Sequence, residues 1–320
     1  MGVLGVLEPL LLLVAGAVLL TVGAEGFAEH VTGAASRLGV SVLALGLLLA
    51  GAEPEEAVTA MLASGQGHPA LAAGDAVGAN LVILTLALGL AAVLTRLPVD
   101  RRGRQYAVAA AVAGAVAWLL LLNGVLGRLE GLLLVLVYVG GVAWVWRREQ
   151  QPPLVGELAE LGEREHDDDD EEAAGRALLM VLLGVLAMVA GGALAVRGAE
   201  SLVGVLHVGE SVIGLTVLAL ATSAEMVALV WAARRRGLSE LVVAGTVGAV
   251  AYNSTVTLGL AALVSPLGLG RHNVITTVAA LTAVLPLVLF AAARSGVLPR
   301  AVGAVLVVAY VGSVGLLLAR

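Results

Sequence analysis

Apolar runs long enough to cross a lipid bilayer make up most of this chain. Arginines, proline and glycine pairs, and acidic residues divide it into ten such runs, each with about the twenty residues that a membrane-spanning helix needs. Only 13% of the residues are charged, and the apolar character comes from Leu, Val, Ala and 41 Gly rather than from aromatic residues. Small residues let membrane helices approach closely. The sequence therefore predicts an all-α polytopic membrane protein with ten transmembrane helices.

The predicted helices form two groups of five, separated by an acidic segment. They cover residues 5–31, 38–64, 69–95, 104–123, 129–147, 176–204, 209–233, 240–265, 273–293 and 299–319. Residues 1–147 are thus expected to form a first five-helix repeat, 148–175 a cytoplasmic linker, and 176–320 a second five-helix repeat. The acidic run 167–172 is typical of a solvated linker, although it would also suit a cytosolic Ca²⁺ sensor.

The arginines orient the predicted helices. If the N-terminus is outside, most arginines fall on the inner side, and the outer side receives only Arg128, Arg197, Arg271 and Arg320. Such an excess of positive charge marks the cytoplasmic side of a membrane protein. We therefore expect a multi-pass protein of the inner (plasma) membrane with both termini outside. Because Glu8 and no basic residue precedes the first apolar run, a cleaved signal peptide is not expected.

The two halves match without a gap at a constant offset of 170 residues. Polar residues and glycines set this register, because Leu, Ala and Val match by chance. The recurring residues include Gly39, Ser41, Glu55, Gly78 and Thr85, which align with Gly209, Ser211, Glu225, Gly248 and Thr255. Since each half has an odd number of helices, the second half must enter the membrane from the opposite side. Inverted repeats are typical of secondary transporters, which bind their substrate near the membrane midplane.

Glu225 is an ionisable residue inside a predicted span. It lies near the middle of Ser211–Ala233, which has no other charge, and such a residue is costly enough to indicate a functional site. Thr222 and Ser223 beside it add hydroxyl oxygens. Carboxylate and hydroxyl oxygens are hard ligands, suited to Na⁺, Ca²⁺ or H⁺. The alternative is a protonated glutamic acid that hydrogen-bonds another helix.

Glu55 aligns with Glu225 but has acidic neighbours. Taken alone, the sequence Glu53-Pro54-Glu55-Glu56 would also suit an interfacial loop. Because the repeat aligns Glu55 with an intramembrane residue, we place it inside the membrane, where Pro54 breaks the helix and frees carbonyl oxygens for a cation. We expect Glu53 and Glu56 to lie nearby but to face other directions.

A second polar block follows in each half, at residues 74–80 and 244–253. We expect its glycines to pack tightly against the glutamate-bearing helix. Asn253 is the best further ligand candidate, and Asn80 lies about one helical turn from the equivalent position. Asp75 would be an acid behind the ligands or in the vestibule. Each of the three could instead form an interhelical hydrogen bond.

Other chemistries find little support in this sequence. The absence of cysteine excludes disulfides, thiolate metal sites and cysteine nucleophiles. The five histidines lack the spacing of zinc-binding motifs and are expected to be solvated or interfacial. No basic stretch interleaved with aromatic residues suggests nucleic-acid binding. We therefore expect neither an enzyme, nor a cofactor, nor a nucleic-acid partner.

The paired blocks resemble the motifs of the cation/calcium antiporter superfamily, which includes the sodium/calcium exchangers. Residues 49–55 and 219–225 resemble its block G-(T/S)-S-x-P-E, and residues 74–79 and 245–249 resemble its block G-(N/D)-x-(I/V)-G-(S/A). The resemblance implies that these helices supply the ion ligands and that sliding of the first and sixth helices exposes the ions alternately. In the first half, Gly51 and Ala52 replace the family's Thr and Ser. The carboxylate pair is thus kept, while much of the hydroxyl set is lost.

The expected function is secondary-active antiport of Ca²⁺, or a related cation, against Na⁺ or H⁺ by alternating access. The alternative is a non-transporting or channel-like membrane protein derived from the exchanger fold. Expected partners are inorganic cations and the lipid bilayer. A monomer is compatible with the sequence, which sets neither the ion pair nor the oligomeric state. The candidate ligands are Glu55, Glu225, Asn253, Thr222, Ser223, Asn80 and Asp75.

Overall fold

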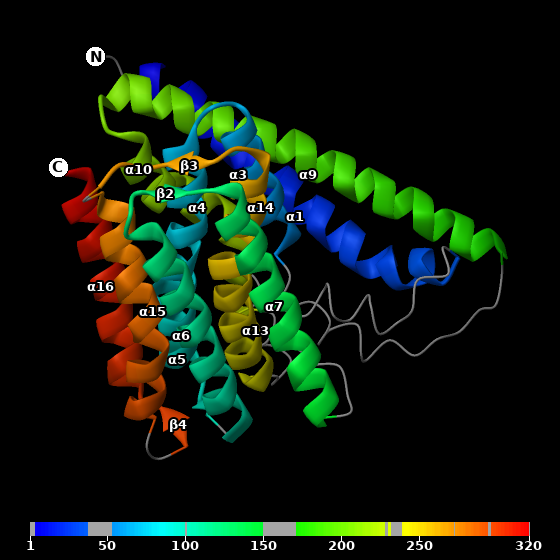
Figure 1. Ribbon diagram of the computed structural model, residues 1–320, viewed down its shortest axis with the longest axis vertical. Helices are drawn as coiled ribbons and strands as arrows, with labels where there is room; N and C mark the ends of the chain where they lie inside the picture. The colour runs from blue at the N-terminus through cyan, green and yellow to red at the C-terminus, as the bar shows by residue number, and fades with distance from the viewer. Residues whose placement is uncertain are drawn as a thin grey trace.

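The structure, a computed structural model, describes residues 4–37, 53–99, 101–149, 171–227, 230–231, 239–271, 273–293 and 296–319. These residues are almost entirely helical (Figure 1). Residues 150–170, which include most of the predicted linker, lie outside the described residues. The same holds for the first part of the predicted helix 38–64 and for the end of the predicted helix 209–233.

The described elements of the first half cover all five of its predicted helices. They are α1 (Leu4–Arg37), α3 (Pro54–Gly65), α4 (Pro69–Leu81), η1 (Val82–Ala87), α5 (Leu88–Leu94), β1 (Leu97–Pro98), α6 (Arg101–Leu121), β2 (Val125–Leu126) and α7 (Arg128–Glu149). The element η1 is a π-helical stretch that joins α4 and α5 into one continuous helix. The predicted single helix 69–95 is therefore present, with a widened turn in its middle.

The second half repeats this order. Its elements are α9 (Glu171–Leu206), α10 (Glu210–Ile213), η2 (Gly214–Leu218), α11 (Ala219–Thr222), α13 (Ser239–Tyr252), η3 (Asn253–Thr257), α14 (Leu258–Val264), β3 (Leu267–Gly268), α15 (Val274–Ala292), β4 (Val297–Leu298) and α16 (Arg300–Leu318). Residues 224–227 and 230–231 are also helical. The two halves thus supply five helical segments each among the described residues, as the sequence predicts.

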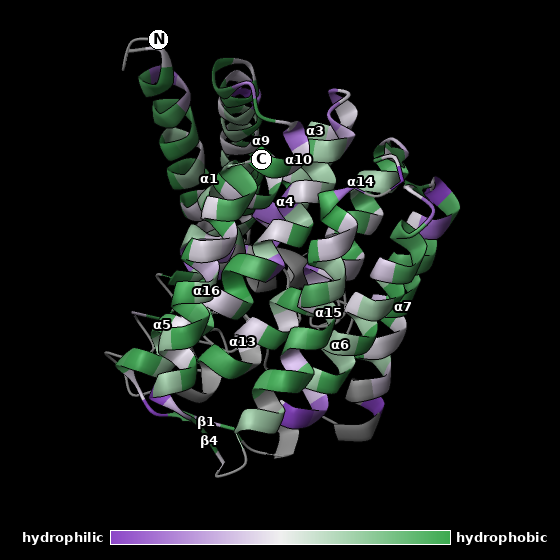
Figure 2. Cartoon of the chain, turned by 90° about the vertical axis from the view of Figure 1, so that its left-hand side faces the viewer, coloured by the Kyte–Doolittle hydropathy of each residue, from purple (hydrophilic) through white to green (hydrophobic). Residues whose placement is uncertain are grey.

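Length and apolar character allow six of the described helices to cross a membrane on their own. They are Gly5–Phe27, Pro69–Leu94, Gly103–Leu121, Gly175–Leu206, Gly245–Val264 and Arg300–Leu318. Burial separates inner from outer spans, because 78% of the Pro69–Leu94 span is buried and only 22% of the Arg300–Leu318 span. The outer helices expose leucine and valine, and apolar colour dominates the outward faces in Figure 2. A lipid-facing shell therefore surrounds a centre built from the second polar block of each half.

Contacts between the halves show that the repeat is inverted. The short strand β1 pairs antiparallel with β4, and β2 pairs with β3, so each strand meets the partner of its own repeat mate. The glycines of α1 and α9 follow the same rule: Gly16 meets Gly191 and Gly23 meets Gly184, with the two helices antiparallel. A Cβ at any of these glycines would lie within 2.8 Å of a backbone oxygen. An all-α membrane fold of two inverted repeats is confirmed.

The segments that the arginine pattern assigns to one side of the membrane gather at one end of the molecule. Figure 1 shows both termini, β2 and β3 at one end and β4, which pairs with β1, at the opposite end. The helices α1 and α9 lie side by side along one flank of the molecule. The centre of the fold therefore lies midway between two ends that are related by the repeat.

Candidate cation site

Both glutamate-bearing helices are interrupted immediately before the glutamate. In the first half, Glu53 has φ −115° and ψ 78°, and α3 begins at Pro54. In the second half, Ser223 ends α11 with φ −84° and ψ 14°, and the chain is helical again from residue 224. Proline suits the first position of a helix, where its missing N–H leaves no bond unmade. Glu55 and Glu225 thus each occupy the second position of an interior helical segment, where the helix dipole favours negative charge.

Three carboxylates from the two halves converge at these interruptions. Glu53, Glu55 and Glu225 each place one carboxylate oxygen within 4.8 Å of the other two. Glu53 is 4% exposed and Glu55 is fully buried, while Glu225 is half-buried. We call these three residues the carboxylate cluster. The structure therefore brings together the two glutamates that the repeat aligns.

The expectation that Glu53 faces away from Glu55 is wrong. It assumed helical backbone, in which neighbouring side chains diverge around the axis. The backbone at Glu53 is not helical, because Pro54 disfavours the α region for the residue before it. Residues two apart point to the same side of an extended chain, and Glu53 accordingly joins Glu55. The cost of burying an ionisable residue in a membrane applied to Glu53 as much as to Glu55, and was the signal that sequence reasoning underused.

Two further carboxylates of the first half receive hydrogen bonds from hydroxyls of the second half. Ser223 Oγ donates to Glu56 Oε1 at 2.7 Å, and Thr222 Oγ1 donates to Asp75 Oδ1 at 3.0 Å. All four side chains are at most 1% exposed. Asp75 is therefore buried between the halves and does not line a vestibule, and Glu56 points inward like its neighbours. We call these four residues the hydroxyl–carboxylate group.

The two candidate asparagines lie in the second polar blocks, and one reaches the opposite half. Asn80 Nδ2 donates to Ser254 Oγ at 2.9 Å, next to Asn253. Asn253 Oδ1 accepts a hydrogen bond from Thr257 Oγ1 at 2.9 Å. Both asparagines are buried. Ser254 is a residue that the sequence interpretation missed, since its only signal was its place directly after Asn253.

Close helix packing positions Asp75 beside Thr222. A Cβ at Gly74 would lie 3.0 Å from the Cα of Gly214, and a Cβ at Gly78 would lie 2.7 Å from the carbonyl oxygen of Leu215. Larger residues would separate α4 from η2, the middle of the glutamate-bearing helix of the second half. The predicted packing of these glycines against that helix is confirmed.

π-Helical turns occur where the central helices pass the site. The stretches η1 and η3 are repeat mates, and Thr85 and Thr255 donate their hydroxyls to the carbonyls of Leu81 and Ala251 at matching positions. Threonine hydroxyls that bond carbonyls four residues earlier compete with the helix ladder and help to bend it. Single π turns are common at functional sites. Both halves thus carry the same local distortion at the same depth.

An aromatic pair borders the carboxylate cluster. The rings of Tyr138 and Tyr252 pack edge to face, with centroids 5.5 Å apart and an interplanar angle of 84°. They belong to a small apolar cluster that includes Ala57 and Val256. Tyr252 lies near enough to Glu53 and Glu55 for electrostatic interaction. This wall keeps the surroundings of the carboxylates largely apolar on one side.

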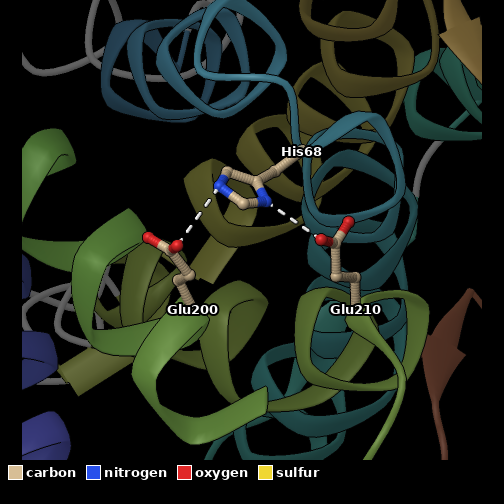
Figure 3. A network of polar contacts seen from close by, with 3 residues as sticks. All are labelled: His68, Glu200 and Glu210. Carbon is tan, nitrogen blue, oxygen red and sulfur yellow. Dashed lines mark hydrogen bonds and ion pairs between the residues drawn. The ribbon is translucent and has the colours of Figure 1, made fainter. Parts of the chain in front are cut away.

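A separate polar link joins the halves at the end that carries the termini. Figure 3 shows His68, from the turn between α3 and α4, between two glutamates of the second half. His68 Nδ1 lies 2.9 Å from Glu210 Oε1, and His68 Nε2 lies 3.7 Å from Glu200 Oε1. His68 is only 20% exposed, so it is interfacial, as expected, but not fully solvated. Because the two glutamates engage opposite nitrogens of one ring, this link does not have the shape of a chelating metal site.

The chemistry of the interior site suits a hard cation. Its described ligand atoms are carboxylate, hydroxyl and amide oxygens, which Ca²⁺ and Na⁺ prefer over soft ligands. Glu53 Oε2, Glu56 Oε2 and Asp75 Oδ2 are buried and have no hydrogen-bond partner among the described residues. A buried carboxylate oxygen without a partner is costly. A cation between the halves would satisfy several of these oxygens at once.

Comparisons with known proteins agree with this geometry. The chain resembles the inner membrane protein YrbG of Escherichia coli (strain K12), with 27% identity over 72% of this chain and 69% of that protein. It also resembles the putative antiporter CaxA of Alkalimonas amylolytica, with 25% identity over 93% of this chain and 94% of the relative. A solved structure of the sodium-calcium exchanger NCX_Mj, soaked with Na⁺ and Sr²⁺, shares the fold with a TM-score of 0.60, at 21% identity over 97% of this chain and 99% of that one.

The family comparison identifies the two repeats together. The family model described as sodium/calcium exchanger protein matches residues 8–147 and 176–319. The matched residues include Glu53, Glu55, Asp75, Thr222 and Glu225, so the interior site lies within the matched parts of both halves. Members of such a family move inorganic cations across membranes and do not form a class of enzymes. The chain belongs to the sodium/calcium exchanger protein family.

Proposed function

We propose that this protein exchanges Ca²⁺, or a related hard divalent cation, for Na⁺ or H⁺ across the inner membrane. The observation that carries the proposal is the carboxylate cluster, in which Glu53 and Glu55 of one half meet Glu225 of the other within 4.8 Å. Three carboxylates suit a divalent cation that has lost part of its water shell. The names of relatives support the same class of cargo, since CaxA is described as a putative antiporter and NCX_Mj as a sodium-calcium exchanger.

The inverted repeat supplies a mechanism for alternating access. The cluster lies at the interface of two halves that enter the membrane from opposite sides, so a movement that opens one end has a mirror movement at the other. The antiparallel pair α1 and α9 packs through glycines and lies along the flank of the central helices. Smooth glycine contacts allow sliding with little steric change. Movement of this pair would uncover the cluster from one side at a time.

The first test is Ca²⁺ uptake into proteoliposomes that contain the purified protein. An outward Na⁺ gradient and an outward H⁺ gradient are applied separately, and either should drive uptake if that ion is the exchange partner. The substitution Glu225→Gln should abolish uptake while the protein remains monodisperse, whereas Glu8→Gln, at an exposed position on α1, should leave it intact. A channel-like protein would instead pass Ca²⁺ without either gradient. A wild-type protein without uptake under any gradient would contradict the proposal.

The proposed orientation places both termini outside the cell. Since the chain has no cysteine, a single introduced cysteine is a unique label. In right-side-out vesicles, a membrane-impermeant thiol reagent should label Gly124→Cys, beside β2, and should spare Gly296→Cys, beside β4. The reverse labelling would overturn the orientation without affecting the proposed exchange.

A further inference from the structure

The hydroxyl–carboxylate group is separate from the carboxylate cluster in its residues and its contacts. Glu56 and Asp75 come from α3 and α4, and Thr222 and Ser223 come from the end of α11. The two hydrogen bonds, at 2.7 Å and 3.0 Å, both join the first half to the second. Glu56 follows Glu55 by one residue on the first helical turn of α3, so the two side chains leave the helix in different directions.

The four residues form one group rather than two isolated pairs. Glu56 lies close enough to Asp75 for their charges to interact, and it also faces the hydroxyl of Thr222 as well as that of Ser223. Glu56 and Asp75 are both fully buried. The close packing of Gly74 on Gly214 holds α4 against the second half at this level. Two carboxylates and two hydroxyls are therefore fixed around one small volume between the halves.

Two oxygens of the group remain available for a ligand. Glu56 Oε2 and Asp75 Oδ2 are buried without a hydrogen-bond partner among the described residues, and none of the salt bridges found there involves Glu56 or Asp75. The hydroxyls of Thr222 and Ser223 point their protons at the carboxylates, which leaves hydroxyl lone pairs for a cation. Removing a carboxylate oxygen from water without a partner costs several kcal/mol, of the order of 1–3 at least. The group thus lacks a positively charged ligand.

The charge of the group favours a monovalent cation. The carboxylate cluster offers three carboxylates and suits a divalent ion. The second group offers two carboxylates, each partly neutralised by a hydroxyl hydrogen bond, together with neutral hydroxyl oxygens. We infer that Glu56, Asp75, Thr222 and Ser223 form a second cation site that binds Na⁺ beside the divalent site. This inference rests on the proposed exchange function, and it assigns the binding of the counter-ion to residues other than the three clustered glutamates.

Direct Na⁺ binding tests the site without any need for transport. Equilibrium dialysis of the purified full-length protein against ²²Na⁺ should show a bound ion in the wild type. Glu56→Gln and Asp75→Asn should each weaken that binding by on the order of tenfold or more, since each removes one charged ligand. Glu8→Gln is the control, and size-exclusion chromatography checks that each variant is folded. Thr222→Val, which keeps both carboxylates and nearly the same volume, should weaken Na⁺ binding as well.

A pair of flux assays tests whether the two sites are separate. Ca²⁺–Ca²⁺ self-exchange in the absence of Na⁺ should stay within about twofold in Glu56→Gln and Asp75→Asn, while Na⁺-driven Ca²⁺ uptake should fall by on the order of tenfold. Equal loss in both assays would overturn the separate site, and so would unchanged Na⁺ binding in all three variants. A wild type that binds Na⁺ through these residues but moves no Ca²⁺ would refute the proposed exchange and leave the second site standing.

Discussion

The two halves of this protein share a backbone plan but divide the chemistry of the site unequally. The elements α5 and β1 recur as α14 and β3 at the offset of 170 residues, and the π turns η1 and η3 recur with them. The first half contributes four of the acids at the centre, whereas the second contributes one glutamate and the hydroxyls of Thr222 and Ser223. Hydrogen bonds between acids of one half and hydroxyls of the other therefore need both halves.

The two helix interruptions show how one residue produces this difference. Pro54 disfavours helical backbone at Glu53, whose ψ is 78°, and this turns the Glu53 carboxylate toward Glu55. Ser223 precedes Ala224 instead of a proline, keeps a ψ of 14° close to the helical region, and reaches Glu56. Equivalent positions thus serve different groups because only one of them is followed by proline.

Removal of a clustered carboxylate should have the largest effect. Glu55→Gln and Glu225→Gln each delete one charge from a buried site, and breaking a buried charge interaction costs about 3–5 kcal/mol. We expect Ca²⁺ flux to fall by at least about a hundredfold in both variants, measured as uptake into proteoliposomes. Similar losses would show that the repeat mates are equivalent. A loss in only one variant would mean that one half alone holds the cargo.

Glycine packing between α1 and α9 should be equally sensitive in both halves. A Cβ at Gly16 would lie 2.7 Å from the Gly191 carbonyl oxygen, and a Cβ at Gly184 would lie 2.7 Å from the Gly23 carbonyl oxygen. Gly16→Ala and Gly184→Ala should therefore each destabilise the protein by about 1–3 kcal/mol. Thermal unfolding in detergent measures this. Gly140→Ala is the control, because a Cβ there meets nothing within 4 Å and alanine favours the helix.

Exchange of the residues after the two interruptions should have an intermediate effect. Pro54→Ala should let Glu53 return toward helical backbone and weaken Ca²⁺ binding by roughly threefold to tenfold, which corresponds to about 1 kcal/mol. Ala224→Pro should push Ser223 out of the helical region and break its bond to Glu56, at a cost of about 1 kcal/mol. Equilibrium dialysis with ⁴⁵Ca²⁺ and ²²Na⁺ separates the two effects. If Pro54→Ala left Ca²⁺ binding unchanged, the proposed role of the proline would be wrong.

The spans, the repeat and the two principal glutamates could be predicted from the sequence because their signals are local. A run of apolar residues indicates a membrane helix wherever it packs, and a constant offset relates the halves without knowledge of their contacts. Glu55 and Glu225 follow from the cost of an ionisable residue in a membrane. These inferences need no knowledge of how the helices cross.

The remaining features depend on geometry between elements. Glu53 joins the cluster because of the backbone angle before Pro54, and Ser254 meets Asn80 because two central helices approach each other at this level. The pairing of acids with Thr222 and Ser223 depends on the close contact of Gly74 with Gly214. Sequence spacing places residues on the faces of single helices, but it does not set the approach between helices from different halves.

The link at His68 should have the smallest effect and should act at one end only. Its partners are Glu200, which is 54% exposed, and Glu210, which is 32% exposed, and pairs of such exposure contribute at most about 1 kcal/mol. At the offset of 170 residues, the sequence has Leu238 in place of His68 and Val40 in place of Glu210, so the repeat supplies no matching link at the other end. We therefore expect His68→Gln to lower the unfolding midpoint by no more than a few degrees.

The same substitution should shift the balance between the two access states, because a contact present at one end stabilises only the states in which that end is closed. About 1 kcal/mol corresponds to at most a fivefold change in that balance. Thiol labelling of Gly67→Cys, in the exposed turn beside His68, measures it in the cysteine-free chain. Faster labelling in the His68→Gln background, with unchanged labelling of Gly296→Cys at the other end, would show that the link holds one end closed. Equal changes at both ends would mean that it only stabilises the fold as a whole.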